Sequence, residues 1–254
     1  MNCDEKLSIV VTGGASGLGA GTIEHMASRG CKAVCIDLPN DAAEARLRAQ
    51  GAHFIACDIT DSQALDKAVE QTIAAVGVPQ VVVNCAGIAP AARTVSKHGA
   101  HAPDLFAQVV SVNLTGSFLV ASKFAAHMVA TEPREDGERG IIINTASVAA
   151  YDGQVGQCAY AASKAGIVGM TLPMARDLAS LGVRVCAIAP GIFETPMVTG
   201  MPEEVQQSLA QQIPFPKRLG TPEDYAALVR HIIENRMLNG EVIRLDGAIR
   251  MGAR

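Results

Sequence analysis

The chain has 254 residues, of which 49% are hydrophobic and 18% are charged, with a formal net charge of −4 at pH 7. This composition excludes a disordered chain, and the length is sufficient to bury a sizeable core without disulfides. The mildly negative charge argues against broad nucleic-acid binding, because there is no global positive field. No apolar run of about 18 residues occurs, so the sequence predicts no membrane-spanning helix.

The first residues are partly acidic and do not form an Arg-rich amphipathic presequence, so we expect a cytoplasmic protein. The seven cysteines include no CxxC pair, and we predict reduced thiols rather than a disulfide framework. His98 and His101 have no further ligands at useful spacing, so no metal site is predicted.

Short apolar runs alternate with helical patterns along almost the whole chain. Most of these runs are continuous and β-branched, as in strands that are buried on both faces. The predicted strands are 7–11, 33–36, 53–57, 80–83, 141–144, 183–188 and 242–245. The predicted helices are near 17–29, 41–50, 61–76, 104–131, 157–180 and 222–235. This order predicts an α/β fold over residues 1–254, a single doubly wound parallel sheet of the Rossmann type with helices on both faces.

Two long segments interrupt the alternation. Residues 87–103 follow the fourth strand, and residues 190–221 contain five prolines after the sixth strand. Both come after the carboxyl ends of strands, where doubly wound sheets bind their ligands. We therefore predict that both are functional loops, the second a substrate loop region.

A glycine-rich turn joins the first strand to the first helix. Glycines in this turn let the chain reverse tightly and let a pyrophosphate approach the amides of the helix N-terminus. The spacing G-x-x-x-G-x-G alone is also compatible with a purely structural turn, but its place between a strand and a helix favours dinucleotide binding. The predicted contacts are Gly13, Ser16, Gly17, Leu18 and Gly19.

Asp37 ends the second strand, 20 residues beyond Gly17. A carboxylate there can accept both hydroxyls of an adenosine ribose. It would repel a 2′-phosphate at about 5 Å by roughly 3 kcal/mol per unit charge at a dielectric of about 20. No Arg or Lys lies in 12–24 to offset this repulsion, so the sequence predicts NAD rather than NADP.

The residues after the third strand allow two interpretations. Asp58 and Ile59 could flank the adenine of the cofactor. A helix N-cap role for Thr60 or Asp61 accounts equally well for the polar residues of this region.

The strongest constellation consists of Ser147, Tyr160 and Lys164. Tyr160 and Lys164 are four residues apart on a predicted helix and share a face. An ammonium at about 4 Å would lower the pKa of the phenol by roughly three units and fit it for general acid–base work near neutral pH. Ser147 lies thirteen residues earlier, just past a strand, where it can hold the reacting oxygen. Asn113 interrupts an apolar helix and could bind the water of a proton relay from Lys164.

Together these residues resemble the short-chain dehydrogenase/reductase family, from Leu7 to Gly252. The resemblance implies that Asn84–Gly87, where the family more often has Asn-Asn-Ala-Gly, steadies the sheet beneath the adenosine. It also implies that Phe193 and Thr195 contact the nicotinamide half of the cofactor and that Lys164 binds the nicotinamide ribose. The further cofactor contacts that the resemblance implies are Asn84, Cys85, Ala86, Gly87, Tyr160 and Pro190.

Longer stretches, such as 141–150, 188–196 and 239–251, resemble the type II 3-hydroxyacyl-CoA dehydrogenases within that family. This implies NAD-dependent oxidation of short or branched 3-hydroxyacyl-CoA by a homotetramer. Residues 90–105 depart from the group, which leaves a steroid or another hydrophobic secondary alcohol as an alternative substrate. An NAD-binding sensor or scaffold without turnover is the alternative from another class.

Three features of the sequence have two interpretations each. Gln154 and Gln157, beside Ser147, could meet a substrate carbonyl or could bond only to the backbone of their loop. Pro173 either kinks the helix that carries Tyr160 or separates two helices. Four residues of the variable loop could meet CoA phosphates or could simply be solvated, namely Arg93, Lys97, His98 and His101.

Overall fold

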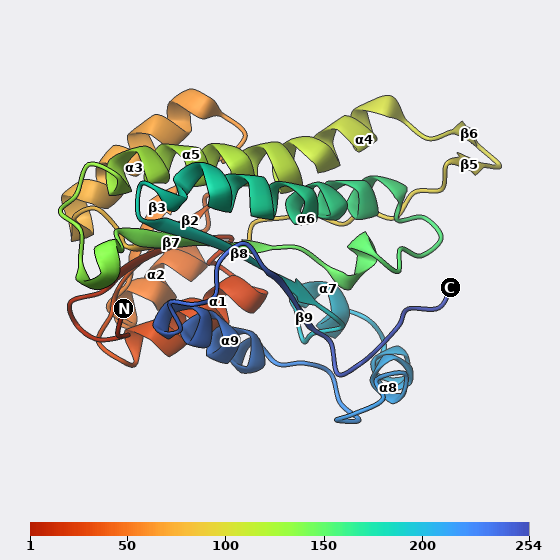
Figure 1. Ribbon diagram of the computed structural model, residues 1–254. Helices are drawn as coiled ribbons and strands as arrows, with labels where there is room; N and C mark the ends of the chain where they lie inside the picture. Colours follow the sequence, from red (N-terminus) through yellow and green to blue (C-terminus); the bar gives the residue numbers. More distant parts are fainter. Residues whose placement is uncertain (254) are drawn as a thin grey trace.

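The computed structural model describes residues 1–253, in which seven parallel strands form one sheet in the order β3-β2-β1-β4-β7-β8-β9 (Figure 1). All seven predicted strands are present, with small shifts of their ends. Their strand order reverses between β1 and β4, which is the topological switch point where doubly wound sheets bind ligands. The strands are β1 (Ser8–Thr12), β2 (Lys32–Asp37), β3 (His53–Ala56), β4 (Val81–Asn84), β7 (Gly140–Thr145), β8 (Val183–Pro190) and β9 (Val242–Leu245).

Helices cover both faces of the sheet, as predicted (Figure 1). Side chains alternate along a strand, so Ile9 and Val11 point to one face while Val10 points to the other. The first face packs on α1 (Gly17–Ala27), α2 (Asp41–Ala49) and α9 (Pro222–Glu234). The second face packs on α3 (Ser62–Val76), α5 (Ser117–Met128) and α6 (Cys158–Ala179).

The predicted helix at 104–131 is three segments in one run, Pro103–Met128. It comprises α4 (Pro103–Val110), a π-helical turn (Ser111–Gly116) and α5. Among residues 1–253 this run is long and apolar enough to cross a membrane by length and composition, contrary to the expectation from apolar runs alone. However, Val120, Phe124 and Met128 are fully buried against the sheet, which is the packing of a core helix.

Pro173 lies inside α6, which is continuous from Cys158 to Ala179. The interpretation that the helix ends and restarts at Pro173 is therefore wrong. The proline is on an exposed position of the helix, while its neighbour Met174 packs into the core. Its missing N–H removes one helical hydrogen bond, and the packed face of the helix is retained.

Both predicted loops contain short regular elements. Residues 87–103 include a hairpin of β5 (Val95–Ser96) and β6 (Gly99–Ala100), which projects from the molecule (Figure 1). Residues 190–221 include α7 (Pro196–Thr199) and α8 (Glu203–Gln211). The remaining short elements are 3-10 turns at Glu135–Gly137 and Val148–Ala150.

Candidate active site

The turn between β1 and α1 requires glycine at three positions. A Cβ on Gly13, whose φ is +67°, would lie 2.6 Å from the amide nitrogen of Ala86, and a Cβ on Gly19 would lie 2.3 Å from the carbonyl oxygen of Gly13. Gly17 has a φ of +51°, in the left-handed region, and a Cβ there would lie 3.4 Å from the side chains of Thr195 and Pro196. Backbone is therefore packed against backbone on one side of the turn, and the start of α1 is left accessible on the other.

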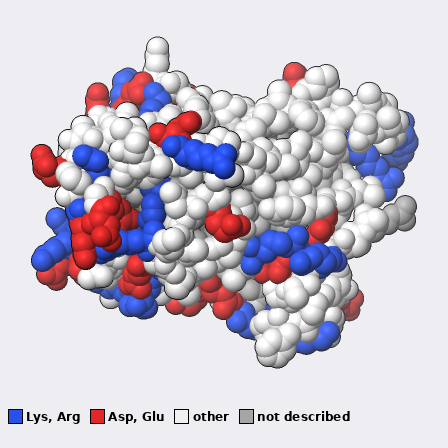
Figure 2. All heavy atoms as spheres, viewed as in Figure 1, with Lys and Arg blue, Asp and Glu red and all other residues white. Residues whose placement is uncertain are grey.

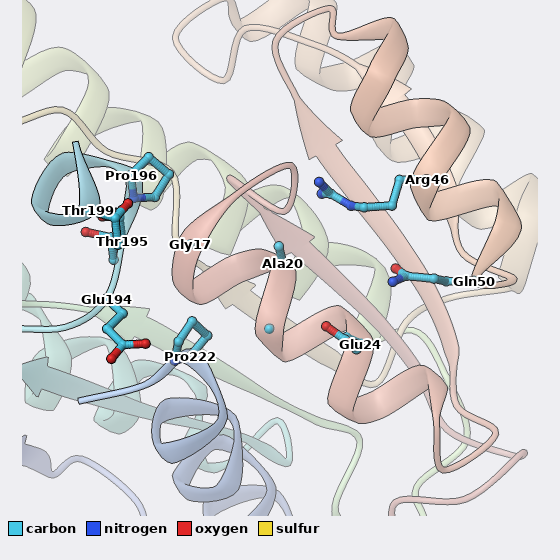
Figure 3. A pocket seen from close by; sticks show the side chains of 11 residues that line it. Gly17, Ala20, Glu24, Arg46, Gln50, Glu194, Thr195, Pro196, Thr199 and Pro222 are labelled. Atoms are coloured by element: carbon cyan, nitrogen blue, oxygen red, sulfur yellow. Dashed lines mark hydrogen bonds between the residues drawn. The ribbon is translucent and has the colours of Figure 1, made fainter. Parts of the chain in front are cut away.

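A cavity of about 320 Å³ adjoins this turn (Figure 3). Gly17 and Ala20 of α1 lie between residues of the 190–221 segment on one side and residues of α2 on the other. Within residues 1–253 the Ser16 hydroxyl makes no capping bond, so the first amides of α1 keep their hydrogen-bonding capacity for a ligand. These amides of the glycine cradle suit a phosphate, while the carboxylates of Glu24 and Glu194 also line the cavity. Its other lining residues include Glu24, Arg46, Gln50, Glu194, Thr195, Pro196, Thr199 and Pro222.

Asp37 and Arg46 hold the two peptides on either side of Ala15 in the glycine turn. Oδ2 of Asp37 accepts a hydrogen bond from the Ala15 amide at 2.9 Å, and its Oδ1 accepts one from the Leu38 amide at 2.8 Å. Arg46 donates to the Ala15 carbonyl oxygen at 2.7 Å. Residues 12–24 contain no cation, but α2 packs beside the glycine turn and places the Arg46 guanidinium there.

After β3, the polar residues bond mainly to one another. The Asp58 carboxylate accepts from the amide and the hydroxyl of Thr60 at 2.9 and 2.7 Å. Asp61 accepts from two amides of the first turn of α3, so it is the N-cap and Thr60 is not. Ile59 is buried and faces Gly116, where a Cβ would lie 2.8 Å from the Ile59 side chain. A contact of Asp58 and Ile59 with adenine stays a prediction.

Asn84 ties together the elements below the site. Its Nδ2 donates to Asn144 Oδ1 at 2.9 Å and to the Ser117 carbonyl at 3.1 Å, and its Oδ1 accepts from the Thr12 hydroxyl at 3.3 Å. These bonds join β1, β4, β7 and α5, which is the steadying role that the family resemblance implies. At Gly87, a Cβ would lie only 3.1 Å from the side-chain oxygen of Asn113, so this position has no room for a larger residue.

The ends of β7 and α6 bring Ser147, Tyr160 and Lys164 together. Ser147 follows β7, and a hydrogen bond from its side chain to Tyr160 lowers the pKa of the phenol. Lys164 is buried, and its Nζ donates to the Thr145 carbonyl at 2.7 Å. Nζ also lies 5.8 Å from the centroid of the Tyr160 ring. A serine, a phenol and an ammonium at the carboxyl edge of the sheet form an acid–base site for an alcohol or a carbonyl.

The predicted effect of Lys164 on Tyr160 is wrong for this structure. Burial raises the pKa of Tyr160, and the Ser147 bond opposes that rise only in part. Burial lowers the pKa of Lys164 to about 8. The reason is that burial disfavours the charged form of both groups, and this desolvation outweighs the attraction between them.

Asn113 lies in the π-helical turn, where its side chain is fully buried. Its amide donates to the Ile88 carbonyl at 2.9 Å and to the Ser163 hydroxyl at 3.0 Å, and its oxygen accepts from the Ile88 amide at 2.8 Å. Ser163 in turn donates to the Tyr160 carbonyl at 2.7 Å. The side chain therefore joins the loop after β4 to α6, and Ser163 is a link that the sequence analysis missed. The relay water stays a prediction.

The predicted substrate glutamines bond to the backbone. Oε1 of Gln157 accepts from the Gln154 amide at 3.0 Å, and Nε2 of Gln154 donates to the Gly252 carbonyl at 3.2 Å. Only the Gln157 bond is to the loop backbone of the second interpretation, while Gln154 bonds to the C-terminal segment; a contact of either with substrate stays a prediction. The Phe193 ring is also turned inward, since a Cβ on Gly220 would lie 2.6 Å from it, so the predicted nicotinamide contact would fall to the Phe193 backbone.

Comparison with known proteins places the chain in a family. The family model described as short chain dehydrogenase matches residues 8–206. The chain belongs to this family. It is 53% identical over 249 residues to 3-hydroxyacyl-CoA dehydrogenase type-2 of Homo sapiens, with 96% of this chain and 95% of that protein covered. It is 49% identical over 246 residues to the protein of the same name from Drosophila melanogaster, with 95% and 96% covered.

A solved structure agrees with the fold as well. The crystal structure of 3-hydroxyacyl-CoA dehydrogenase type-2 from Mycobacterium avium superposes with a TM-score of 0.92 at 39% identity, over 100% of both chains. The seven-stranded doubly wound sheet is thus that of a short chain dehydrogenase, and the chain is an oxidoreductase enzyme. The predicted family and fold are both confirmed.

Proposed function

We propose that this short chain dehydrogenase oxidises short or branched 3-hydroxyacyl-CoA thioesters with NAD. The observation that carries the proposal is the convergence of Ser147, Tyr160 and Lys164 at the carboxyl edge of the sheet, where a Cβ on Gly87 would lie 3.6 Å from Lys164 Nζ. The names of the relatives, whose sequences match along nearly the whole chain, add the substrate class. A sensor without turnover would not need a buried lysine beside a tyrosine and a serine.

Each residue of the site has a part in the reaction. The Ser147 hydroxyl holds the oxygen of the 3-hydroxyl group, and Tyr160 as phenolate takes its proton. When bound, the nicotinamide ring supplies the acceptor for the hydride that leaves the carbinol carbon. Lys164, whose Nζ is held by the Thr145 carbonyl, is the group that would donate to a ribose hydroxyl of the bound cofactor. Asn113 bonds to Ser163 of α6 and to Ile88 of the loop after β4, and so holds these two segments together.

NAD rather than NADP is proposed because of the Asp37 carboxylate. Its place at the end of β2, beside the glycine turn, suits the ribose hydroxyls and repels a 2′-phosphate. The positive charge of Arg46, which bonds to the Ala15 carbonyl of the same turn, weakens that repulsion. We therefore expect a preference for NAD and not an absolute exclusion of NADP.

The CoA moiety is proposed to lie toward the hairpin of β5 and β6. Figure 2 shows basic side chains gathered at the end of the molecule where this hairpin projects. Arg93, Lys97 and His98 are exposed there, and Arg93 and Lys97 take part in none of the ion pairs within residues 1–253. Unpaired cations near the site suit the phosphates of CoA.

A homotetramer is proposed as the assembly. Phe118 of α5 and Leu172 of α6 are large apolar side chains with exposed fractions of 49% and 44%. Apolar groups of this kind on two helices of the same face are available for contacts between subunits. Sedimentation equilibrium would give the subunit number directly.

The test is the initial rate of NADH formation by the purified protein. The substrates are 3-hydroxybutyryl-CoA, its 2-methyl analogue, free 3-hydroxybutyrate and a 17β-hydroxysteroid, each with NAD or NADP. We expect the CoA esters with NAD to react fastest. A rate confined to the steroid or the free acid would refute the substrate class, and a faster rate with NADP would refute the role of Asp37.

A further inference from the structure

Three polar side chains, the buried Thr145 and Tyr225 and the partly buried Cys85, meet beneath the catalytic residues. The Thr145 hydroxyl lies 2.7 Å from the Tyr225 hydroxyl and 3.6 Å from the Cys85 sulfur. The Cys85 sulfur lies 3.7 Å from the Tyr225 hydroxyl. Cys85 follows β4, Thr145 ends β7, and Tyr225 comes from α9. We call this cluster, Cys85–Thr145–Tyr225, the polar ring.

The geometry gives each member of the polar ring one donor and one acceptor role. The Cys85 thiol donates to the Tyr225 hydroxyl, and the Thr145 hydroxyl donates to the Cys85 sulfur. The Tyr225 hydroxyl then closes the ring by donating to the Thr145 oxygen. All three groups are satisfied by one another, which offsets the cost of burying them.

The polar ring reaches across the sheet edge. Tyr225 packs with α1 in the core on the first face, where it is the largest fully buried side chain. Lys164 belongs to α6, which covers the second face. A phenylalanine would fill the same buried space as Tyr225. Among residues 1–253, the Tyr225 hydroxyl bonds only to the other two members of the polar ring.

Thr145 connects the polar ring to the reacting residues. Its side chain belongs to the ring, while its carbonyl accepts the bond from Lys164 Nζ at 2.7 Å. Ser147 is two residues further along the same segment. A shift of the Thr145 backbone would therefore displace the acceptor of Lys164 and the start of the segment that carries Ser147.

We propose that the polar ring fixes the Thr145 carbonyl so that Lys164 is held in its working position, which makes Tyr225 a positioning residue for the dehydrogenase reaction. Tyr225 acts through Thr145 and Lys164 and from the opposite face of the sheet. This inference rests on the proposed function where kcat is measured. The affinity for the cofactor is a second measurement, which needs no turnover.

The main test is Tyr225→Phe, which keeps the buried ring and removes the hydroxyl. We expect kcat to fall about tenfold with little change in the KM of the acyl-CoA, because a small displacement of a catalytic group slows the chemical step. We also expect the Kd of NADH, from its fluorescence, to rise about threefold as Lys164 loosens. The matched control is Ile232→Val, a loss of buried volume on the same helix away from the ring.

Two more variants separate positioning from stability. Thr145→Val keeps the shape of the side chain and removes its hydroxyl, so it should reproduce the effect of Tyr225→Phe, and the double variant should add little. Cys85→Ala removes the donor and the acceptor at this corner of the polar ring, so it should lower kcat as Tyr225→Phe does.

The outcomes are distinct. If Tyr225→Phe retains the wild-type kcat and NADH affinity, the proposal is overturned. It is also overturned if Ile232→Val, at a matched loss of melting temperature, slows the reaction equally. If the wild type shows no turnover with any acyl-CoA, the proposed function fails, and the NADH affinity of Tyr225→Phe still decides whether the polar ring holds Lys164.

Discussion

The Asp37 carboxylate accepts a hydrogen bond from the main-chain amide of Ala15, at 2.9 Å. The residue expected to select the cofactor therefore also holds the glycine turn on which the cofactor would rest. One carboxylate oxygen holds the glycine turn, while the negative charge of the group would repel a 2′-phosphate on the ribose. A substitution that keeps an oxygen acceptor separates these two roles, and one that removes the acceptor disturbs both.

Asp37→Asn should change cofactor preference. The amide oxygen can still accept from Ala15, but the negative charge that repels a 2′-phosphate is lost. We expect the ratio of kcat/KM for NAD over NADP to fall by at least about tenfold. Asp41→Asn, which removes an exposed carboxylate from the start of α2, is the matched control and should leave the ratio nearly unchanged. An unchanged ratio in Asp37→Asn would remove the carboxylate from the selection of the cofactor.

Arg46→Gln tests the bond to the carbonyl of the same residue, Ala15. The substitution removes the charged bond to the Ala15 carbonyl at 2.7 Å and the positive charge near the ribose site. We expect the Kd of NADH to rise about threefold and the preference for NAD over NADP to increase. Arg48→Gln, an exposed arginine of the same helix that pairs with Glu44, is the control. Better use of NADP by Arg46→Gln would contradict this account.

The sheet and its helices could be predicted because their signals are local. Continuous β-branched runs such as 141–144 and 183–188 identify buried strands, and the glycine spacing of the first turn reports on backbone contacts inside that turn. Asp37, Ser147, Tyr160 and Lys164 could be found in the same way, since each stands at a strand end or at helical spacing from a partner.

The missed features depend on residues far apart in the sequence. Arg46 reaches the glycine turn only because α2 packs beside it, and a search limited to 12–24 could not include it. Thr145, Cys85 and Tyr225 meet only when two strand ends and α9 are assembled. The pKa of Tyr160 was predicted from charge alone, whereas burial, which the sequence does not quantify, decides its direction.

Tyr160→Phe should abolish turnover without abolishing cofactor binding. Without the phenol no side chain is placed to take the proton of the substrate hydroxyl, so kcat should fall by at least about a thousandfold. The Kd of NADH should stay within about threefold, because the glycine cradle is untouched. Tyr151→Phe, at a half-exposed tyrosine whose ring lies 5.2 Å from the Arg244 guanidinium, is the control and should remain active. Residual activity of Tyr160→Phe above a few per cent would point to another base.

Lys164→Met should inactivate the enzyme and stabilise the protein. Burial lowers the pKa of Lys164 from 10.5 to about 8, so the folded state holds this proton more weakly than the unfolded chain does. Between these two values the unfolded chain binds more protons, and the stability of the wild type rises with pH; below about pH 8 the full cost of the buried charge is present.

Methionine removes that cost and loses the bond to the Thr145 carbonyl. We expect the free energy of unfolding without cofactor to increase by about 1–2 kcal/mol at pH 7, and the gain to shrink as the pH is raised from 8 toward 10. Urea unfolding at pH 7 and at higher pH measures both, with Lys67→Met, at an exposed lysine of α3, as the control. A Lys164→Met variant that is less stable than the wild type at pH 7 would show that the bond to Thr145 outweighs the cost of burying the charge.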